Sequence, residues 1–490
     1  MSLTLGALFP TAPAEIAERP LAGLTADSRE AKPGFAFVAI SGSRLAGADF
    51  VGAAVAAGAV AVIGEGERPA DLPSDIAYLR VPDARAALAQ AAARLHPGQP
   101  ETIVAVTGTA GKSSVADFVR QIALHCGREA ASLGTLGVVT KEGVRYGSLT
   151  TPDPIGLHRT LDALARDGIT HLAMEASSHG LDQKRLDGVR LSAAAFTNLG
   201  RDHLDYHPTM EAYLAAKMRL FEALLPKGRP AVINRDGAYA REAEGVARAC
   251  GHAVLGVGRD GDFLRLEDVR LDGFTQVVDI VHAGRRTTIR FPLVGAFQVE
   301  NALVAAALCI ATGEDPVRAF GALEHLRGVP GRLDPVGEVG GALCLVDYAH
   351  KPDALEKVLA TLRPLARNRL VCVVGCGGDR DRGKRPLMGR IAAEGADLAI
   401  VTDDNPRSED PASIRAEVMA GIPAGTPGVV EIGDRAEAIR RAVAELKAGD
   451  VLVVAGKGHE TGQIVGERTL PFSDHEAVRA AIAMVEGKAL

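Results

Sequence analysis

Residues 107–114 have the composition of a phosphate-binding loop. They read Thr-Gly-Thr-Ala-Gly-Lys-Ser-Ser and lie between two apolar segments, residues 103–106 and 115–119. This order predicts a strand, a turn and the start of a helix. Glycines let the backbone approach a polyphosphate, while the free N–H groups of the helix N-terminus and the Lys112 ammonium attract it. The Ser113 hydroxyl can reach Mg²⁺.

The spacing of this loop differs from that of the standard P-loop. Only Thr109 and Ala110 separate Gly108 from Gly111, whereas four residues lie between the corresponding glycines of the standard loop. An ordinary strand-to-helix turn is the alternative interpretation. The Lys-Ser pair in this local context favours nucleotide binding.

Polar residues follow two further apolar strands of the same region. Glu175 comes directly after residues 170–174, and His203 lies in the polar segment that follows residues 193–197. Ligands bind at the carboxyl ends of strands in open parallel sheets, so we expect both residues near the phosphate loop. With Ser113 they are candidate Mg²⁺ ligands, because Mg²⁺ needs few protein ligands. A solvated glutamate and a structural histidine are the alternatives.

Lys217 lies in an expected helix over residues 210–225. An ammonium group repels Mg²⁺, so the residues alone favour a solvated lysine.

The last third of the chain predicts a doubly wound parallel sheet. Strand-like segments alternate there with helical ones, near residues 344–347, 370–374, 398–402, 429–432 and 451–455. Arg380, Arg407, Asn405 and Glu460 lie in loops that follow these strands. Guanidinium groups bind carboxylates and Glu460 can pair with an ammonium, so the set suits a zwitterionic amino acid. A solvated basic loop is the alternative for Arg380.

Length and composition indicate a multidomain α/β protein. A chain of 490 residues exceeds one usual hydrophobic core, and we expect three domains, over residues 1–98, 99–329 and 330–490. The net charge of -6 argues against a general nucleic-acid or anionic-membrane binder. The sequence has neither a signal-peptide pattern nor a long apolar run, so we expect a cytoplasmic protein without membrane insertion. The six scattered cysteines form no zinc pattern.

Ordered motifs along essentially the whole chain resemble those of the Mur ligase family. They are Asp27-Ser28-Arg29, TGTAGKSS from Thr107, Thr150-Thr151-Pro152, MEASSHGL from Met174, FTNLGRDHLDYH from Phe196, AAKMRLF from Ala215, Gly331-Arg332, DYAHKPDAL from Asp347, GGDRDRGKRPLMG from Gly377, DDNPR from Asp403 and GKGHE from Gly456. The resemblance implies an N-terminal domain for a uridine nucleotide. It also implies a central P-loop ATPase-type parallel sheet and a C-terminal Rossmann-like domain for an amino acid.

The resemblance further implies a carbon–nitrogen ligase of peptidoglycan synthesis, a process that supports cell shape and division. Its expected reaction adds meso-diaminopimelate to UDP-MurNAc-L-Ala-D-Glu, with ATP as co-substrate, Mg²⁺ as cofactor and an acyl phosphate as intermediate. We expect a monomer that closes its third domain onto the second before chemistry.

The family motifs also imply roles for individual residues. The UDP end would contact Ala26, Ser28, Ser43, Arg44 and Leu45, and the muramoyl-peptide would contact Thr150, Thr151, Ser177, Gln183 and Arg185. ATP would contact Gly108, Thr109, Ala110, Gly111, Lys112, Ser113, Ser114, Asn301, Arg332 and Asp347. Diaminopimelate would contact Arg380, Asp404, Asn405, Pro406, Arg407, Gly456 and Glu460.

The resemblance explains how a lysine can lie at a Mg²⁺ site, because the lysine of the family that matches Lys217 is carbamylated. The resulting carboxylate-like group would help His203 to hold a second Mg²⁺. Lys112, Glu175, His203 and Lys217 are therefore the expected catalytic group. Two departures from the family pattern are Ala110, where asparagine is usual, and residues 43–49, which lack a histidine often found there.

Three other functions remain possible at this level. A lysine-adding ligase of the same family should lack the arginine of DNPR, and a ligase that joins glutamate to folate does not suit the DNPR loop or the Asp-Ser-Arg motif. A nucleotide-binding regulator without catalysis would not need Lys112, Glu175, His203 and Lys217 together. The Arg407 guanidinium matches the distal carboxylate that diaminopimelate has and lysine lacks.

Overall fold

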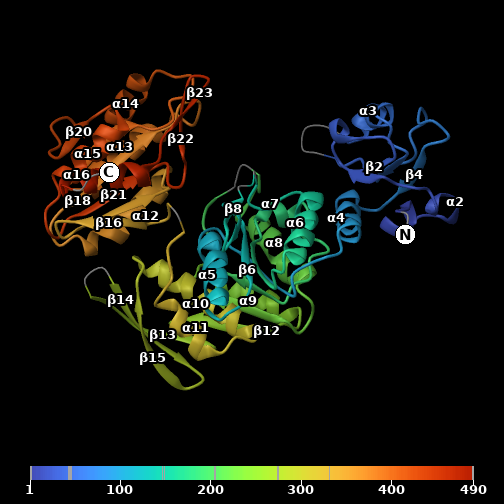
Figure 1. Cartoon of the computed structure of the whole chain (residues 1–490), viewed down its shortest axis with the longest axis horizontal. Helices are drawn as coiled ribbons and strands as arrows, with labels where there is room; N and C mark the ends of the chain where they lie inside the picture. The colour runs from blue at the N-terminus through green and yellow to red at the C-terminus, as the bar shows by residue number, and fades with distance from the viewer. Residues whose placement is uncertain are drawn as a thin grey trace. The chain divides into compact units, whose positions relative to one another are not determined.

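A computed structural model describes residues 3–41, 47–145, 147, 149–202, 206–272, 275–329 and 331–487. The chain forms two compact units (Figure 1). The first comprises Met1–Glu267, Ile280–Thr287 and Glu300–Leu323, and the second comprises Asp268–Asp279, Thr288–Val299 and Glu324–Leu490. The boundaries of the three expected domains stay a prediction.

The N-terminal part of the first unit is a four-stranded parallel sheet in the order β1-β2-β3-β4. Its strands are β1 (Gly23–Thr25), β2 (Phe35–Val38), β3 (Ala61–Gly64) and β4 (Ala77–Arg80). The helices are α1 (Leu5–Leu8), α2 (Ala14–Ala17), α3 (Val51–Ala56) and α4 (Ala84–Leu95), with 3-10 turns η1 (Ser28–Glu30) and η2 (Gly47–Phe50).

An eleven-stranded sheet follows in the order β15-β14-β13-β12-β11-β10-β5-β9-β6-β7-β8. Its strands are β5 (Thr102–Thr107), β6 (Ala130–Gly134), β7 (Gly137–Thr140), β8 (Gly143–Arg145), β9 (His171–Glu175), β10 (Ala193–Phe196), β11 (Pro230–Asn234), β12 (Ala253–Gly258), β13 (Leu264–Asp272), β14 (Thr275–His282) and β15 (Arg285–Phe291). The strands from β12 to β6 are parallel, whereas β7 and β8 are antiparallel additions.

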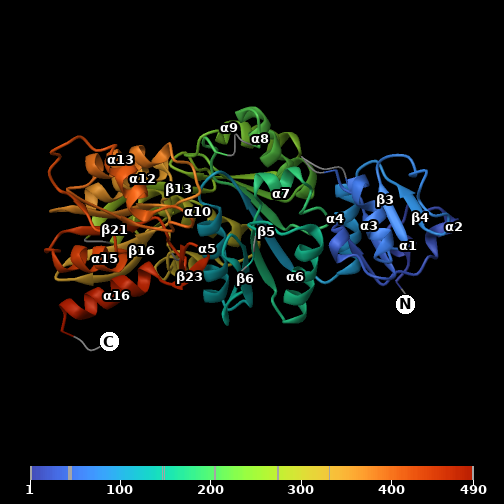
Figure 2. The same cartoon turned by 90° about the horizontal axis from the view of Figure 1, so that it is seen from above.

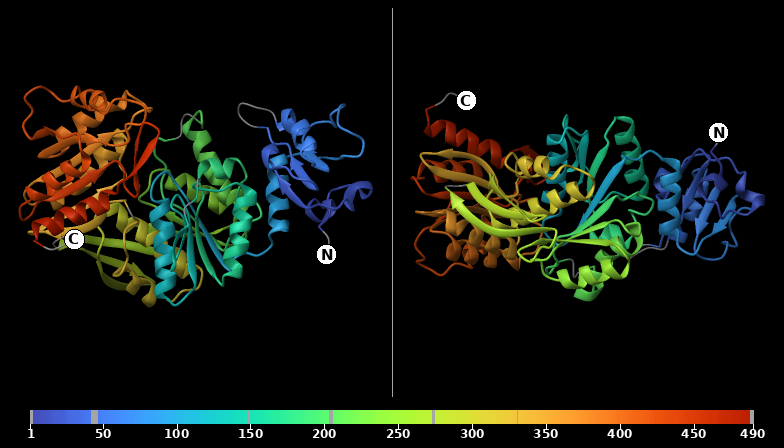
Figure 3. Two further views of the ribbon diagram at one scale, coloured as in Figure 1. Left: turned by 45° about the horizontal axis from the view of Figure 1, so that its top comes forward. Right: turned by 90° about the horizontal axis from the view of Figure 1, so that it is seen from below.

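Helices cover both faces of the parallel strands. They are α5 (Lys112–His125), α6 (Pro154–Arg166), α7 (Ser178–Asp182), α8 (Met210–Arg219), α9 (Ala240–Ala249), α10 (Ala296–Ala311) and α11 (Pro316–Leu323). Figures 2 and 3 show α5 and α6 on opposite sides of β5 and β6. Strands covered on both faces need apolar side chains on both, which explains continuous runs such as Ala-Ala-Ala-Phe in β10. The helix expected over 210–225 instead ends at Arg219 and continues as a π-helical turn, η3 (Leu220–Leu224).

The second unit contains a six-stranded sheet in the order β16-β17-β21-β18-β19-β20. Its strands are β16 (Asp334–Val339), β17 (Ala342–Asp347), β18 (Leu370–Cys376), β19 (Leu398–Asp403), β20 (Val429–Glu431) and β21 (Val451–Ala455). The helices are α12 (Pro352–Leu362), α13 (Lys384–Gly395), α14 (Pro411–Met419), α15 (Arg435–Ala444) and α16 (Asp474–Val485), with the 3-10 turn η4 (Arg363–Leu365).

The five strands expected in this region are confirmed, and they are parallel. Alternate residues of β17 pack into two different apolar clusters: Leu343 and Leu345 into one, Cys344 and Val346 into the other. Both faces of the sheet are therefore buried, as expected for a doubly wound fold. The sequence did not predict the antiparallel edge strand β16 or the hairpin of β22 (Gly462–Val465) and β23 (Arg468–Pro471).

Within the described parts of the chain, no helix combines the length and apolar character needed to cross a membrane.

Candidate active site

The phosphate loop connects β5 to α5 in the first unit, as the sequence predicts. Gly111 precedes the first residue of the helix and has a φ of 89°. A Cβ at this position would lie 2.3 Å from Asn301 Oδ1, so only glycine lets the loop approach α10 this closely. The geometry thus brings Asn301, which the sequence placed at the ATP site, directly against the loop.

Lys112 begins α5 and folds back over the loop. Its Nζ donates hydrogen bonds to the carbonyl oxygens of Gly108 (2.8 Å) and Thr109 (3.0 Å). Thr109 and Ala110 are themselves held by the segment after β10, since Asn198 Oδ1 accepts a bond from Ala110 N at 3.0 Å. The loop is therefore fixed by backbone contacts, and the alanine at position 110 takes part through its main chain.

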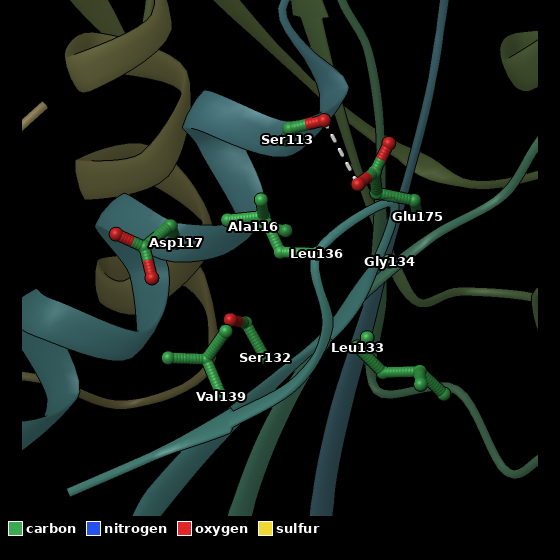
Figure 4. Close-up of a pocket in the computed structure, with 10 residues that line it drawn as sticks. Ser113, Ala116, Asp117, Ser132, Leu133, Gly134, Leu136, Val139 and Glu175 are labelled. Atoms are coloured by element: carbon green, nitrogen blue, oxygen red, sulfur yellow. Dashed lines mark hydrogen bonds between the residues drawn. The ribbon is translucent and has the colours of Figure 1, made fainter. Parts of the chain in front are cut away.

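Glu175, at the end of β9, lies against the start of α5. Its Oε1 accepts a hydrogen bond from Ser113 Oγ at 2.9 Å (Figure 4). The same oxygen accepts a bond from Thr135 N at 2.7 Å, and Glu175 is buried. Thr135 Oγ1 also lies 3.1 Å from Thr150 Oγ1. The structure thus joins two predicted metal ligands, Ser113 and Glu175, and connects them to a predicted muramoyl-peptide contact.

The remaining predicted muramoyl-peptide contacts form one network beside Glu175. Thr151 Oγ1 donates to the Glu175 carbonyl (3.0 Å) and lies 3.0 Å from Ser177 Oγ. Arg185 donates to the Thr151 carbonyl (2.7 Å) and to Gln183 Oε1 (2.7 Å). A bound substrate in this network would lie next to the phosphate loop.

Lys217 reaches the same loop from α8. Its Nζ donates a 2.7 Å hydrogen bond to the Gly108 carbonyl and lies 4.4 Å from the centroid of the Tyr213 ring. The side chain is 1% exposed, and burial together with the nearby Lys112 charge lowers its pKa to about 6. The solvated lysine that the residues alone favoured is therefore wrong.

Some predicted contacts lie apart from this network or outside the described residues. Ala26 lies just before the short turn η1 and Ser28 is its first residue; both are partly exposed. His203 lies outside the described residues, as does the segment of Ser43, Arg44 and Leu45.

Two predicted ATP contacts, Arg332 and Asp347, lie in the second unit. The Arg332 guanidinium lies 5.0 Å from the centroid of the Tyr348 ring. Asp347 ends β17, and its carboxylate accepts 2.7 Å bonds from Leu333 N and Ala349 N. Burial raises the pKa of this carboxyl, and the two N–H donors oppose that rise.

The DNPR loop follows β19 in the second unit, and its residues meet the GKGHE loop after β21. Asn405 Nδ2 donates to Glu460 Oε2 at 2.8 Å. Arg407 Nη1 donates to the Gly378 carbonyl at 2.8 Å. Gly456 lies so close to Asp404 that a Cβ would fall 2.7 Å from its Oδ2. These predicted amino-acid contacts therefore form one cluster, in which Pro406 is buried.

Arg380 differs from the rest of this predicted set. It is exposed, and its guanidinium donates to the neighbouring Asp379 carbonyl at 2.9 Å. Asp379 in turn accepts a 2.7 Å bond from Ser408 Oγ, so the loop that carries Arg380 is held beside the DNPR loop.

Sequence reasoning missed two residues that contact the predicted site directly. Thr135 donates both its N–H and its hydroxyl to Glu175. Lys457, inside the GKGHE loop, is fully buried between Asn405 and Glu460. The signal for Thr135 was its place directly after a strand, and that for Lys457 was a lysine between two glycines.

Comparisons with known proteins cover most of the chain. Three family models match: "Mur ligase family, catalytic domain" over residues 20–96, "Mur ligase middle domain" over residues 106–309, and "Mur ligase, glutamate ligase domain" over residues 331–458.

Among curated relatives, the UDP-N-acetylmuramoyl-L-alanyl-D-glutamate–2,6-diaminopimelate ligase of Bradyrhizobium diazoefficiens is 57% identical over 472 residues, which are 96% of both chains. The protein of the same name from Caulobacter vibrioides is 51% identical over 93% of this chain and 94% of its own.

Solved structures of ligases with such names share the fold of this chain. A structure of a UDP-N-acetylmuramoyl-L-alanyl-D-glutamate–2,6-diaminopimelate ligase matches with a TM-score of 0.77 and 35% identity, covering 99% of this chain and 100% of that one. The MurF ligase of Thermotoga maritima in complex with ADP shares the fold at 20% identity, with a TM-score of 0.59 and coverage of 95% and 98%. With its phosphate loop, its buried glutamate and relatives this similar over their full length, the chain belongs to the Mur ligase family.

Proposed function

We propose that this chain is the ATP-dependent ligase that adds meso-diaminopimelate to UDP-N-acetylmuramoyl-L-alanyl-D-glutamate in peptidoglycan synthesis. The observation that carries the proposal is the 57% identity, over 96% of both chains, to a curated ligase of that name. We further propose that it acts as a monomer in the cytoplasm, where its nucleotide substrates are found.

ATP is proposed to bind with its phosphates on the loop between β5 and α5. The first N–H groups of α5 point into this loop and carry the positive end of the helix dipole. Lys112 already places its ammonium over the loop, where it donates to two carbonyl oxygens. A phosphate oxygen would be a stronger, charge-assisted partner for this ammonium than a neutral carbonyl.

Mg²⁺ fits the oxygen atoms next to this loop. Ser113 Oγ and Glu175 Oε1 lie 2.9 Å apart at the start of α5, and Mg²⁺ prefers such hard oxygen ligands. We propose that these two residues hold it, together with His203. When bound, Mg²⁺ would neutralise the charge that develops on the transferring phosphoryl group.

Lys217 is proposed to carry a carbamate. A lysine whose pKa is about 6 is mostly a free amine at neutral pH, and a free amine can attack CO₂. A carbon–nitrogen bond forms, the amine loses one proton, and the side chain becomes an anion. In the unmodified protein the charge of Lys112 opposes protonation of Lys217. A carbamate on Lys217 would be negative, so its interaction with the Lys112 ammonium would become attractive.

In the first step, the D-glutamyl carboxylate of the precursor attacks the γ-phosphorus of ATP and the bond to the β-phosphate oxygen breaks. The products are an acyl phosphate and ADP. We propose that Thr150, Thr151, Ser177, Gln183 and Arg185 orient the precursor. Their network includes Glu175, so it would hold the reacting carboxylate near the phosphate loop.

In the second step, an amine of diaminopimelate attacks the acyl carbon, and phosphate leaves as the amide forms. We propose that the DNPR loop, Gly456, Glu460 and Arg380 bind the amino acid. Nη1 of Arg407 is bonded to Gly378, while Nη2 and Nε of this guanidinium have no partner among the described residues. These two donors form a fork for the distal carboxylate of diaminopimelate, which L-lysine lacks.

Phosphate release from ATP tests this proposal. Purified protein with Mg²⁺ and UDP-MurNAc-L-Ala-D-Glu is assayed with meso-diaminopimelate, with L-lysine and without an amino acid. Release that depends on diaminopimelate supports the proposal. Release with lysine instead would make the chain a lysine-adding ligase, and release with neither amino acid would favour a folate-type ligase or a nucleotide-binding regulator.

A further inference from the structure

Lys457 is a fully buried lysine that the proposed reaction does not yet use. Its side chain is 0% exposed, and its Nζ lies 3.0 Å from Asn405 Oδ1, 3.2 Å from Glu460 Oε2 and 3.7 Å from Asp404 Oδ1. All three partners belong to the proposed diaminopimelate pocket. An unpaired buried ammonium would be costly, so these contacts are what allow Lys457 to be buried.

The backbone on both sides of Lys457 packs closely against neighbouring residues. Gly456 and Gly458 have φ values of 122° and 55°. A Cβ at these positions would lie 2.7 Å from Asp404 Oδ2 and 2.8 Å from Tyr348 Cβ, respectively. A side chain at either position would clash, so glycine is needed on both sides of Lys457.

Lys457 helps to fix the orientation of the Asn405 side-chain amide. The two lone pairs of Asn405 Oδ1 are used by Lys457 Nζ at 3.0 Å and by Ile464 N at 2.9 Å. One N–H of Asn405 Nδ2 is used by Glu460 Oε2. If the Asn405 amide were turned by 180°, its NH₂ would face the two donors Lys457 Nζ and Ile464 N, and its oxygen would face the Glu460 carboxylate. These contacts would be repulsive, so the surroundings permit only the observed orientation of the amide.

Two groups in this cluster are left to bind a ligand. Among the described residues, the second N–H of Asn405 Nδ2 and the oxygen Oε1 of Glu460 have no partner. The first can donate to a carboxylate, and the second can accept from an ammonium. Both belong to side chains that Lys457 contacts through their other terminal atom, and together they match one end of a zwitterionic amino acid.

The charge of Lys457 is not duplicated by its neighbour Arg435. The Arg435 guanidinium is fully buried, and it is bonded to both oxygens of Asp474 at 2.7 and 2.8 Å. Arg435 also acts electrostatically on Asp404 and Glu460, but Lys457 is the cation that contacts both carboxylates directly, at 3.7 and 3.2 Å.

We propose that Lys457 is a positioning residue that fixes the Asn405 amide and the Glu460 carboxylate in the arrangement that receives the ammonium and carboxylate of diaminopimelate. This inference rests on the proposed function of the chain. It assigns a role in amino-acid selection to a residue that does not itself contact the substrate.

The test compares Lys457→Met with Arg369→Met. Methionine keeps an unbranched side chain that is one heavy atom shorter, and it removes the charge. The control breaks the contact of Arg369 with the buried Asp450, at 2.7 Å in the same unit, without touching Asn405 or Glu460. The measurements are the melting temperature, the KM for each of the three substrates, kcat, and the ratio of kcat/KM for diaminopimelate to that for L-lysine.

For Lys457→Met we expect the KM for diaminopimelate to rise by about 10-fold or more, with kcat and the KM for ATP changed by less than about 3-fold. The preference for diaminopimelate over lysine should fall as well. Arg369→Met should lower the melting temperature and leave both the KM values and the preference unchanged. In the Asn405→Ala background, Lys457→Met should have a much smaller effect, because the amide that it positions is absent.

A loss of kcat with all three KM values and the preference unchanged would overturn the inference, as would equal effects of Lys457→Met with and without Asn405. If Lys457→Met does not fold, the same measurements are made on Lys457→Gln, which removes the charge and retains a hydrogen-bond donor. If the wild-type chain releases no phosphate with diaminopimelate, the proposed function fails, and this result is distinct from failure of the role of Lys457.

Discussion

At the scale of single residues, the phosphate loop brings two lysines to one carbonyl oxygen. Lys112 and Lys217 donate to the Gly108 carbonyl at 2.8 and 2.7 Å. Two ammonium groups this close repel each other, and Lys217 is the more deeply buried of the pair. Lys217 is therefore the one that loses its proton, and its pKa is lowered to about 6.

This pKa predicts how carbamylation of Lys217 depends on pH. The amine must be free to attack CO₂, so the carbamate should be nearly absent at roughly pH 5 and should increase as the pH rises through about 6. Carbon-13 NMR of the protein in ¹³C-bicarbonate measures the carbamate carbon. The signal should be missing in Lys217→Arg, and a signal that persists in this variant would assign it to another amine.

Lys217 should also affect the pH dependence of stability. Its pKa is lowered in the folded state, so the unfolded chain binds one more proton between about pH 6 and pH 10.5. The contribution of Lys217 to the free energy of unfolding therefore rises with pH in this window, in the absence of CO₂. Urea unfolding at several pH values gives the free energy of unfolding as a function of pH. This free energy should rise less steeply with pH in Lys217→Met than in the wild type, and an unchanged pH dependence would contradict the lowered pKa.

A substitution at Arg407 tests the selection of the amino acid. Arg407→Ala removes the guanidinium fork, and we expect kcat/KM for diaminopimelate to fall by about 10²- to 10⁴-fold. Arg407→Lys should restore little of this loss, because a single ammonium does not reproduce the fork. Calorimetry should find ATP binding unchanged in both variants. An equal loss of ATP binding would contradict the assignment of Arg407 to the amino-acid pocket.

At the scale of elements, the site depends on how closely strand ends approach one another. Gly134 ends β6, and β9 beside it ends at Glu175. A Cβ at Gly134 would lie 2.0 Å from Glu175 Oε1, so the carboxylate occupies the space that a side chain would take. The absence of a side chain at the end of one strand thus positions the functional group of its neighbour.

Gly134→Ala should therefore damage the active site more than the fold. The new methyl group would displace Glu175 from Ser113 and Thr135, and we expect ATP turnover to fall by about 10²-fold or more. The free energy of unfolding should fall by only about 1–3 kcal/mol.

The matched control for this substitution is Gly245→Ala. Gly245 lies within α9, where a Cβ would meet nothing within 4 Å. It should raise stability by about 0.5–1 kcal/mol and leave turnover unchanged. Wild-type turnover in Gly134→Ala would show that the Glu175 carboxylate can move without consequence.

At the scale of the whole molecule, the proposed reactants bind to different units. The phosphate loop, Glu175 and Asn301 belong to the first unit, whereas Arg332 and the DNPR loop belong to the second. In the proposed mechanism the acyl phosphate forms on one unit and the amine is held by the other, so we predict that ligand binding closes the units onto one another before the second step.

Small-angle X-ray scattering can measure this expected closure. The radius of gyration should decrease when a non-hydrolysable ATP analogue, Mg²⁺, the precursor and diaminopimelate are added together. The precursor alone should have a smaller effect, because it does not contact the second unit in the proposed mechanism. An unchanged radius with all ligands bound would contradict closure.

Much of this molecule followed from local sequence. Continuous apolar runs predicted β5, β9, β10 and the five parallel strands of the second unit, because strands buried on both faces must be apolar throughout, and Gly-Lys-Ser after such a run predicted the phosphate loop. The parallel strands β6, β11 and β12 were not predicted. The edge strand β16 and the hairpin β22–β23 were not predicted, because partly exposed strands lack this continuous apolar pattern.

The sequence by itself determined the family and the parallel α/β sheets of both units, and it supplied the proposed members of the site, because motifs and strand patterns are local properties of the chain. Only the tertiary structure decided which of these residues touch and what charge they carry. Apart from the family resemblance, Lys217 read as a solvated lysine, and Lys457 was not singled out, since burial depends on segments far away in the sequence. It is the contact of Lys217 with Gly108, and of Lys457 with Asn405, that turns each into part of a site.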